Sequence, residues 1–170
     1  PEGVTSIGSN AFQFCSNLTN VTLPSSLTTI GFNAFSFCDS LTSIVVPEGV
    51  TSIGSEAFKN CTAMVSVVFP TSMQAVGDRA FARCSGLEEV HISDLNSWAA
   101  IRFSDDEANP IFHAGTLFLS GAPVKSLRID PTWELPRQNN SYNFRYLTSL
   151  EEVHIPVEVK SLNKDIFIGC

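Results

Sequence analysis

Charged residues are scarce in this sequence. Only 16% of its 170 residues are Asp, Glu, Lys or Arg, against roughly 25% in ordinary globular domains. The 10 Lys and Arg are outnumbered by 17 Asp and Glu, so the chain lacks the basic face on which nucleic-acid binders depend. It also lacks any run of about 18 apolar residues that would span a membrane. These absences argue against a disordered charged chain, a nucleic-acid partner and membrane insertion.

Motifs for catalysis and cofactor binding are also missing. The chain has no P-loop, dinucleotide-binding fingerprint or zinc ribbon, and no local Ser-His-Asp or Cys-His arrangement. The acidic run 105–107 lacks the alternating spacing of a calcium loop, so we interpret it as a solvated loop, with Ca²⁺ binding as the alternative. The pairs Glu88-Glu89 and Glu151-Glu152 should point to opposite faces of a strand, unlike a glycosidase pair. We predict that the protein is not an enzyme and holds no metal or cofactor.

What the sequence does contain is a repeat. Four units of 23 residues fill residues 1–92 without insertion, each with Pro, Ile/Val-Gly, Ala-Phe, Cys and a final alternating apolar segment in the same phase. The pattern returns in residues 150–170 after an irregular unit in 93–149. Such periodicity indicates stacked supersecondary units rather than separate domains. We predict a single solenoid domain over residues 1–170.

Each unit should form one coil of that solenoid. The segment Leu-x-x-Val-x-Leu alternates like a half-buried strand, and Pro ends it. Val-x-x-Ile-Gly should be a second short extended piece closed by a turn at Gly. Ala-Phe-x-x-Cys is too short for a stable helix, so we expect one helical or 3-10 turn. The result is a β-rich α/β repeat solenoid of about seven coils, roughly 35 Å long. Stacking should bury one column of rings: Phe12, Phe35, Phe58, Phe81 and Phe167.

The pattern P-x-x-V-x-x-I-G-x-x-A-F-x-x-C-x-x-L-x-x-V-x-L resembles the BspA-like leucine-rich repeats of surface proteins in bacteria and some protozoa. The resemblance is strongest in residues 1–92 and 156–170, and the middle is similar to a variant unit through Asp94-Leu95-x-x-Trp98, Asn109-Pro110 and 117–121. It implies a right-handed coil stack with a parallel sheet on one face. It also implies a surface-exposed or secreted protein used for adhesion. The ligand itself is not implied, because family members differ.

The first part of the irregular unit, from Ser93 to Ile129, has 37 residues where 23 would suffice. Asp94 is a good N-cap, and the apolar spacing after it predicts a short helix over Asp94–Ile101. Residues 116–129 read as two strands around a turn at Ser120–Pro123. Residues 131–140 contain two prolines and an amide run, and should bulge as a loop. This unit is either a binding epitope or a repeat that drifted while keeping its core.

The five cysteines share one phase of the repeat and should form a column with one thiol per coil, about 5 Å apart. No two lie within metal-ligand spacing. Parallel Cβ vectors do not suit a disulfide, so we predict reduced structural thiols, with disulfide pairing as the alternative. The set is Cys15, Cys38, Cys61, Cys84 and Cys170.

The outward-facing side chains of the Leu-x-x-Val-x-Leu strands form the candidate binding surface. Early coils offer small neutral and β-branched residues there, whereas later coils offer charged ones: Glu89, His91, Arg128, Glu152 and His154. A sheet face that changes in this way suits a protein or glycan ligand. The alternative is that polar and β-branched residues simply suit an exposed strand. The two strand histidines lie too far apart to share a metal ion.

Together with the resemblance, which implies the surface location and the role in adhesion, these observations predict a cell-surface or secreted adhesion module that binds an extracellular or host-surface protein, possibly a glycan, through the strand face. One alternative is a structural spacer without a ligand. Another is the ancillary glycan-binding domain of a surface enzyme. Because the chain begins and ends inside the pattern, we expect it to be a piece of a longer protein, with flanking coils or domains covering both ends.

Overall fold

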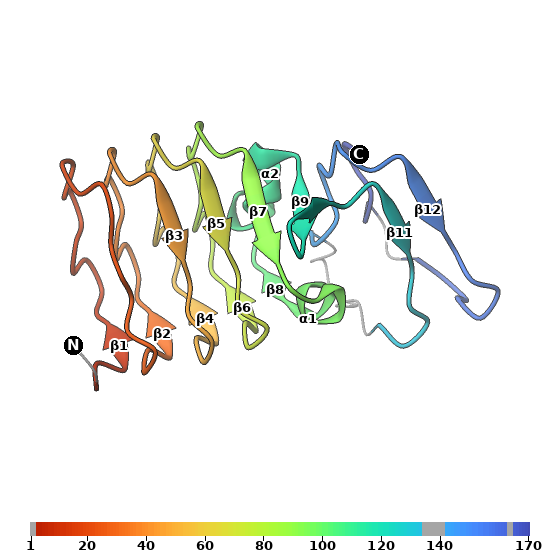
Figure 1. The fold of residues 1–170 in the computed structure, drawn as a ribbon, viewed down its shortest axis with the longest axis horizontal. Coiled ribbons are helices and arrows are strands. Elements are labelled where there is room, and N and C mark those ends of the chain that lie inside the picture. The colour runs from red at the N-terminus through yellow and green to blue at the C-terminus, as the bar shows by residue number, and fades with distance from the viewer. Residues whose placement is uncertain (1–2, 134–141, 163–164) are drawn as a thin grey trace.

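The computed structural model describes residues 3–133, 142–162 and 165–170. The chain winds into a β-rich solenoid of about six turns with a few short helices, as the repeat predicts, although the expected number of coils was about seven. Successive coils lie side by side along the long axis, with the N-terminal coil at one end (Figure 1).

The Val-x-x-Ile-Gly segments form a sheet of five parallel two-residue strands, one per coil. Each strand pairs in register with the same segment of the next coil, for example Ile30 with Ile53. The family resemblance implied a sheet on one face, and this narrow sheet adds a second. Its strands are β1 (Ser6–Ile7), β2 (Thr29–Ile30), β4 (Ser52–Ile53), β6 (Ala75–Val76) and β8 (Arg102–Phe103).

The Leu-x-x-Val-x-Leu segments form the wider strand face. Parallel strands β3 (Ser43–Val45), β5 (Ser66–Val68), β7 (Glu89–Ile92) and β9 (Leu117–Leu119) lie next to one another, and β10 (Ala122–Pro123) pairs antiparallel with β9. Beyond this hairpin a separate parallel pair follows, β11 (Ser126–Arg128) with β12 (Glu152–His154). The β9–β10 hairpin therefore divides the strand face into two parts.

The Ala-Phe-x-x-Cys segments are neither α-helical nor 3-10, so that expectation was wrong. In the second coil Asn33 (φ 54°) and Phe37 (φ 61°) adopt left-handed conformations, which end helical hydrogen bonding after every turn. Each segment is a series of β-turns. Every second N–H bonds to the next coil, as where Phe35 N donates to Ala57 O at 2.7 Å, and those between them close the turns, as where Ser36 N donates to Asn33 O at 3.2 Å. Hydrogen bonds between coils thus replace part of those that a helix would make within itself.

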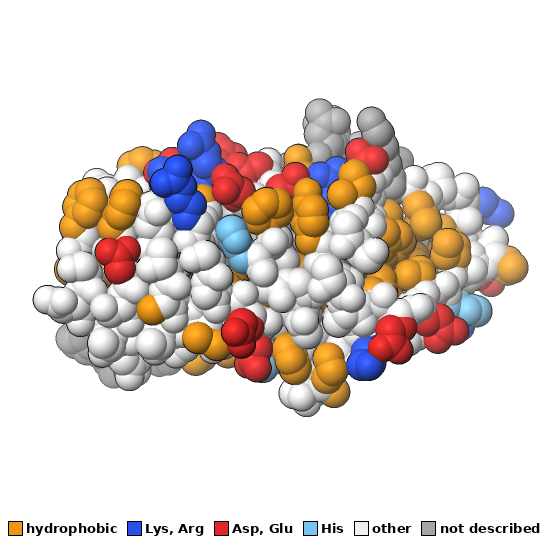
Figure 2. Space-filling model, turned by 90° about the horizontal axis from the view of Figure 1, so that it is seen from above, with side chains coloured by type: hydrophobic (Ala, Val, Ile, Leu, Met, Phe, Trp, Pro, Cys, Tyr) orange, Lys and Arg blue, Asp and Glu red, His pale blue; other side chains and the backbone are white. Residues whose placement is uncertain are grey.

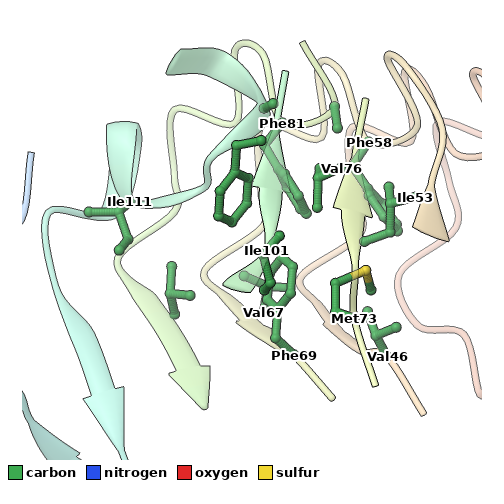
Figure 3. Close-up of a cluster of buried hydrophobic side chains, with 14 of the residues drawn as sticks. Val46, Ile53, Phe58, Val67, Phe69, Met73, Val76, Phe81, Ile101 and Ile111 are labelled. Atoms are coloured by element: carbon green, nitrogen blue, oxygen red, sulfur yellow. The ribbon is translucent and has the colours of Figure 1, made fainter. Parts of the chain in front are cut away.

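Stacked phenylalanines fill the centre of the solenoid. Phe35, Phe58 and Phe81 are fully buried, and their ring centroids lie 5.4 and 5.3 Å apart in sequence order. Figure 3 shows aliphatic side chains of both sheets, among them Ile53 and Val67, packed around these rings. The predicted column is confirmed for these three rings, because a 23-residue period returns the same side chain to the same place. Phe12 stacks on Phe35 with centroids 5.1 Å apart but is 37% exposed, and Phe167 is only partly buried, so the expectation that they are buried was wrong.

The irregular unit contains the three short helices. Asp94 caps α1 (Leu95–Ala100) by accepting a 2.7 Å hydrogen bond from Ser97 N, as the sequence predicts. After β8, η1 (Asp106–Ala108) and α2 (Ile111–Ala114) lead into β9. They take up the extra length of this unit.

The hairpin turn is tighter than expected. Positive φ angles at Ser120 (50°) and Gly121 (84°) place the turn at these two residues, as in the twist-matched turns that join antiparallel strands. Ala122 and Pro123 belong to strand β10 rather than to the turn, and the segment 126–128 pairs with β12, not with β9. The expectation of two strands around a four-residue turn is corrected accordingly. Most of the predicted bulging loop 131–140 lies outside the described residues.

Candidate functional site

Four side chains form a continuous row on the solvent side of the strand face. Val45, Val68, His91 and Phe118 stand opposite one another on β3, β5, β7 and β9. We call them the outward row. At the usual strand spacing the row is about 14 Å long. Val45 remains 61% exposed, so the row begins with an apolar side chain that faces water.

His91 is held on two sides within the outward row. Its ring stacks on Phe118 with centroids 4.9 Å apart, and its Nε2 lies 2.8 Å from Glu89 Oε2. The side chains of Glu89 and His91 leave the same face of β7 because they are two residues apart. This arrangement fixes the imidazole beside both a carboxylate and an aromatic ring.

Phe118 is the member of the outward row that the sequence interpretation missed. It lies 27 residues after His91 instead of 23, because the helices of the irregular unit intervene. A strand at 117–119 was expected. With Leu117 buried, alternation along that strand would have placed Phe118 outward.

The other predicted residues form a second group beyond the hairpin. Arg128 stands opposite His154, and Ser126 opposite Glu152, on strands β11 and β12. The Ser126 hydroxyl donates to Glu152 Oε2 at 3.2 Å. Charged side chains gather in two groups along the lower edge of Figure 2, with hydrophobic ones between them. The structure thus brings Glu89 and His91 together, and separately Arg128, Glu152 and His154.

Arg128 also lines a cleft of about 450 Å³. The cleft lies between the start of α1, the β9–β10 hairpin and the segment that follows β11, and Trp133 forms part of its wall. Among the described residues the Arg128 guanidinium has no hydrogen-bond or ion-pair partner. Its five N–H donors are therefore available to a ligand.

The cysteines act as hydrogen-bond donors to the neighbouring coil. Cys38, Cys61, Cys84 and Cys170 donate their thiols to phenylalanine carbonyl oxygens at 3.2, 3.3, 3.2 and 3.0 Å. All five cysteines are free in the structure. Burial raises the pKa of Cys38 to about 11 and of Cys84 to about 12, and raises that of Cys61 as well. These thiols remain protonated and are poor nucleophiles, so their role is structural.

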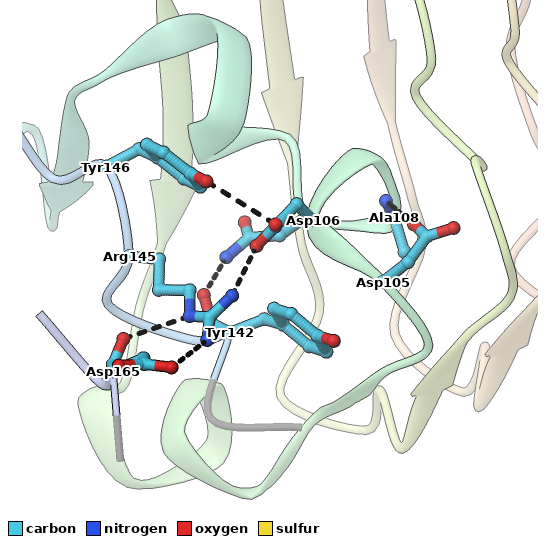
Figure 4. Close-up of polar contacts among 8 residues, drawn as sticks. Asp105, Asp106, Ala108, Tyr142, Arg145, Tyr146 and Asp165 are labelled. Carbon is cyan, nitrogen blue, oxygen red and sulfur yellow. Dashed lines mark hydrogen bonds and ion pairs between the residues drawn. The ribbon is translucent and has the colours of Figure 1, made fainter. Parts of the chain in front are cut away.

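The acidic run is part of the framework and not a solvated loop, so that interpretation was wrong. Asp105 caps η1 by accepting from Ala108 N at 2.6 Å. Asp106 binds Arg145 Nη1 at 2.9 Å and also accepts from the Tyr146 hydroxyl at 3.4 Å (Figure 4). Across residues 3–133, 142–162 and 165–170, no three His, Cys, Asp or Glu side chains group as metal ligands.

Comparison with protein families identifies the repeat. A sequence model of the BspA type leucine rich repeat region matches residues 1–107 and 132–170 in six copies. The chain belongs to the BspA-type leucine-rich repeat family. The part of this BspA-type chain that the family model leaves out, 108–131, contains α2, the β9–β10 hairpin and β11. A comparison with curated proteins finds no match.

Solved bacterial leucine-rich repeat proteins share the BspA-type fold. The Treponema pallidum protein TpLRR is 27% identical with a TM-score of 0.58, and the alignment covers 91% of this chain and 65% of that one. A Eubacterium ventriosum protein is 24% identical (TM-score 0.62, 99% and 41% covered). A Bacteroides ovatus protein is 23% identical (TM-score 0.52, 100% and 57% covered). The chain thus spans less than two thirds of each of these proteins.

BspA-type repeats are generally non-catalytic scaffolds for protein interaction, typical of surface or secreted bacterial proteins. None of the helices in the described part of this chain has the length and apolar character to cross a membrane. Two surface features of this BspA-type chain carry side chains suited to a ligand: the outward row and the cleft beside Arg128.

Proposed function

We propose that this chain is a cell-surface or secreted adhesion module that binds an extracellular protein through the outward row. The observation that carries the proposal is the position of His91, fixed between Glu89 and Phe118 in the middle of an otherwise apolar row. Protein interfaces commonly combine an apolar or aromatic centre with a polar rim. The outward row and Glu89 supply both.

The strands that carry the row are well suited to present it. Their inward side chains, among them Ile44, Val67, Val90 and Leu117, are fully buried or nearly so. Buried neighbours and a continuous parallel ladder hold the outward side chains in fixed positions. Binding would therefore cost little additional ordering of this surface.

The net charge supports a protein partner over a nucleic acid. The chain carries a formal charge of −7, which repels a phosphate backbone. The second predicted group consists of Arg128, Glu152 and His154. It would form the polar rim of the interface with a partner that reaches across the hairpin. In this proposal the chain has no catalytic role and requires no cofactor.

Binding of the purified chain to a panel of extracellular-matrix proteins tests the proposal. The variant Val68→Asp/His91→Ala places a charge in the outward row and removes its central ring, and we expect affinity to fall about tenfold or more. Gln74→Ala, an exposed side chain beside β6 on the other sheet, is the matched control. Equal binding by both variants, or no binding to any protein of the panel, would instead favour a structural spacer.

A further inference from the structure

The cleft beside Arg128 is a built polar site distinct from the outward row. Its volume of about 450 Å³ falls within the range of small-molecule sites, about 300–1,000 Å³. Three chain segments form its walls. These are the start of α1, the hairpin turn, and the stretch from Arg128 to Trp133.

Two carboxylates line this cleft, Asp94 before α1 and Asp130 after β11, and one oxygen of each already accepts hydrogen bonds from its own segment. Asp94 Oδ2 accepts from both the amide and the hydroxyl of Ser97, at 2.7 Å each. Asp130 Oδ1 accepts from the amide and the hydroxyl of Thr132, at 2.8 and 2.7 Å. These hydrogen bonds lower the pKa of both carboxyl groups, so both remain ionised at neutral pH. The second oxygen of each is left as an acceptor for a ligand.

Donors and an aromatic surface complete the cleft. Asn96 Oδ1 accepts from Trp133 Nε1 at 2.6 Å, so the Asn96 amide group keeps both of its donors. Trp133 stacks on Phe144 with ring centroids 5.5 Å apart, which holds the indole in place. A second hollow of about 270 Å³ adjoins the cleft and shares Asn96, Asp130 and Trp133 with it. Trp133 therefore lines both hollows.

The charge of the site decides the class of ligand. Two carboxylates and one guanidinium leave a net charge of about −1, which disfavours an anion. A ligand with many hydroxyl groups can donate to both carboxylates and accept from Arg128 and Asn96. The flat, partly apolar face of a sugar ring can lie against the indole. We propose that this cleft and the adjoining hollow bind a short neutral oligosaccharide.

Titration with soluble sugars tests this site. The probes are cellotriose, maltotriose, xylotriose and mannotriose as neutral ligands and trigalacturonate as the acidic comparison, followed by tryptophan fluorescence and calorimetry. We expect at least one neutral trisaccharide to bind and to change the emission of Trp133, because Trp98 is buried in the core. Trigalacturonate should bind more weakly than that sugar.

Two variants and one control locate the binding. Arg128→Ala removes an exposed side chain without opening the core, and should weaken affinity about tenfold through the loss of charged hydrogen bonds. Trp133→Ala should abolish the fluorescence change, with circular dichroism to verify folding. Lys125→Ala removes a neighbouring cation that pairs with Glu151 outside the cleft, and should leave affinity unchanged. The proposal is overturned if no neutral sugar binds at about 10 mM, if trigalacturonate binds most tightly, or if Arg128→Ala binds as well as the parent.

Discussion

Asp106 and Arg145, 39 residues apart in the sequence, form an ion pair of 2.9 Å that ties η1 to the segment before β12. The Arg145 side chain is only 13% exposed. Its Nε also donates to the backbone carbonyl of Asp165 at 2.9 Å, and its guanidinium lies over the Tyr142 ring, 4.6 Å from the centroid. One arginine thus connects η1 with two later segments of the chain (Figure 4).

Replacing Asp106 by Ala should lower the free energy of unfolding by about 1–3 kcal/mol, because it leaves a mostly buried guanidinium with fewer partners. Urea denaturation measures the change. The control is Lys125→Ala, which breaks the exposed pair with Glu151 and should cost less than about 1 kcal/mol. Equal losses in the two variants would show that the Asp106 pair is no more than a surface contact.

The sequence was sufficient to predict much of what the 23-residue period imposes: the strand segments of most coils, the buried rings of Phe35, Phe58 and Phe81, and one thiol in each regular coil. It was also sufficient for the Asp94 cap, which is a local signal. It was not sufficient for the Asp106–Arg145 pair, because nothing local links two residues so distant in the chain. The left-handed turns were missed for another reason. Asn33 and Asn60 accept positive φ readily. Phe37, Glu56 and Arg83 at the equivalent positions have no such preference, and hydrogen bonds to the next coil impose that conformation.

Thiol labelling should separate the cysteines by position. We expect Cys15, which is exposed, to react rapidly with a soluble disulfide reagent at pH 8. Cys61 and Cys84 are fully buried and their pKa values are raised by that burial, so they should react only when the chain unfolds. Mass spectrometry of the labelled peptides gives the order in which the cysteines react. Fast labelling of Cys84 in the folded protein would contradict the structural role assigned to this column.

His113 should make stability depend on pH. Its ring is partly buried, its Nε2 has no partner in the described structure, and it meets the Phe112 ring edge-on at 5.0 Å. Burial lowers its pKa, although the charge of Glu107 and a backbone contact with Phe81 oppose the shift. The folded pKa therefore lies below the unfolded value of about 6.5.

The unfolded chain consequently binds more protons than the folded chain in that range. The contribution of His113 is complete above about pH 6.5 and is lost as the pH falls from there through the folded pKa, with a slope below about 1.4 kcal/mol per pH unit. Unfolding free energies at pH 5.5 and 7.5 measure the effect. The variant His113→Gln, which does not titrate, should show a smaller difference. An unchanged difference would assign the pH dependence to other groups.

The repeated glycines are required by close approach between coils rather than by an unusual backbone angle. A Cβ on Gly54 would lie 2.6 Å from Phe32 N and 2.7 Å from the carbonyl carbon of Gly31. Neither Gly31 nor Gly54 has a positive φ. The same substitution at Gly8, in the first coil, would meet no atom within 4 Å. Gly8 and Gly54 thus occupy the same position of the repeat, but only Gly54 has backbone atoms of the preceding coil packed against it.

Gly54→Ala should lower the free energy of unfolding by about 1–3 kcal/mol, because backbone atoms cannot move aside without separating two coils. Gly8→Ala should change it by less than about 1 kcal/mol, and the lower entropy of the unfolded alanine chain favours a slight gain. Thermal and urea unfolding of both variants measure the contrast. If Gly8→Ala destabilises as much as Gly54→Ala, the glycine is needed for its own turn, and the spacing between coils is not what excludes a side chain.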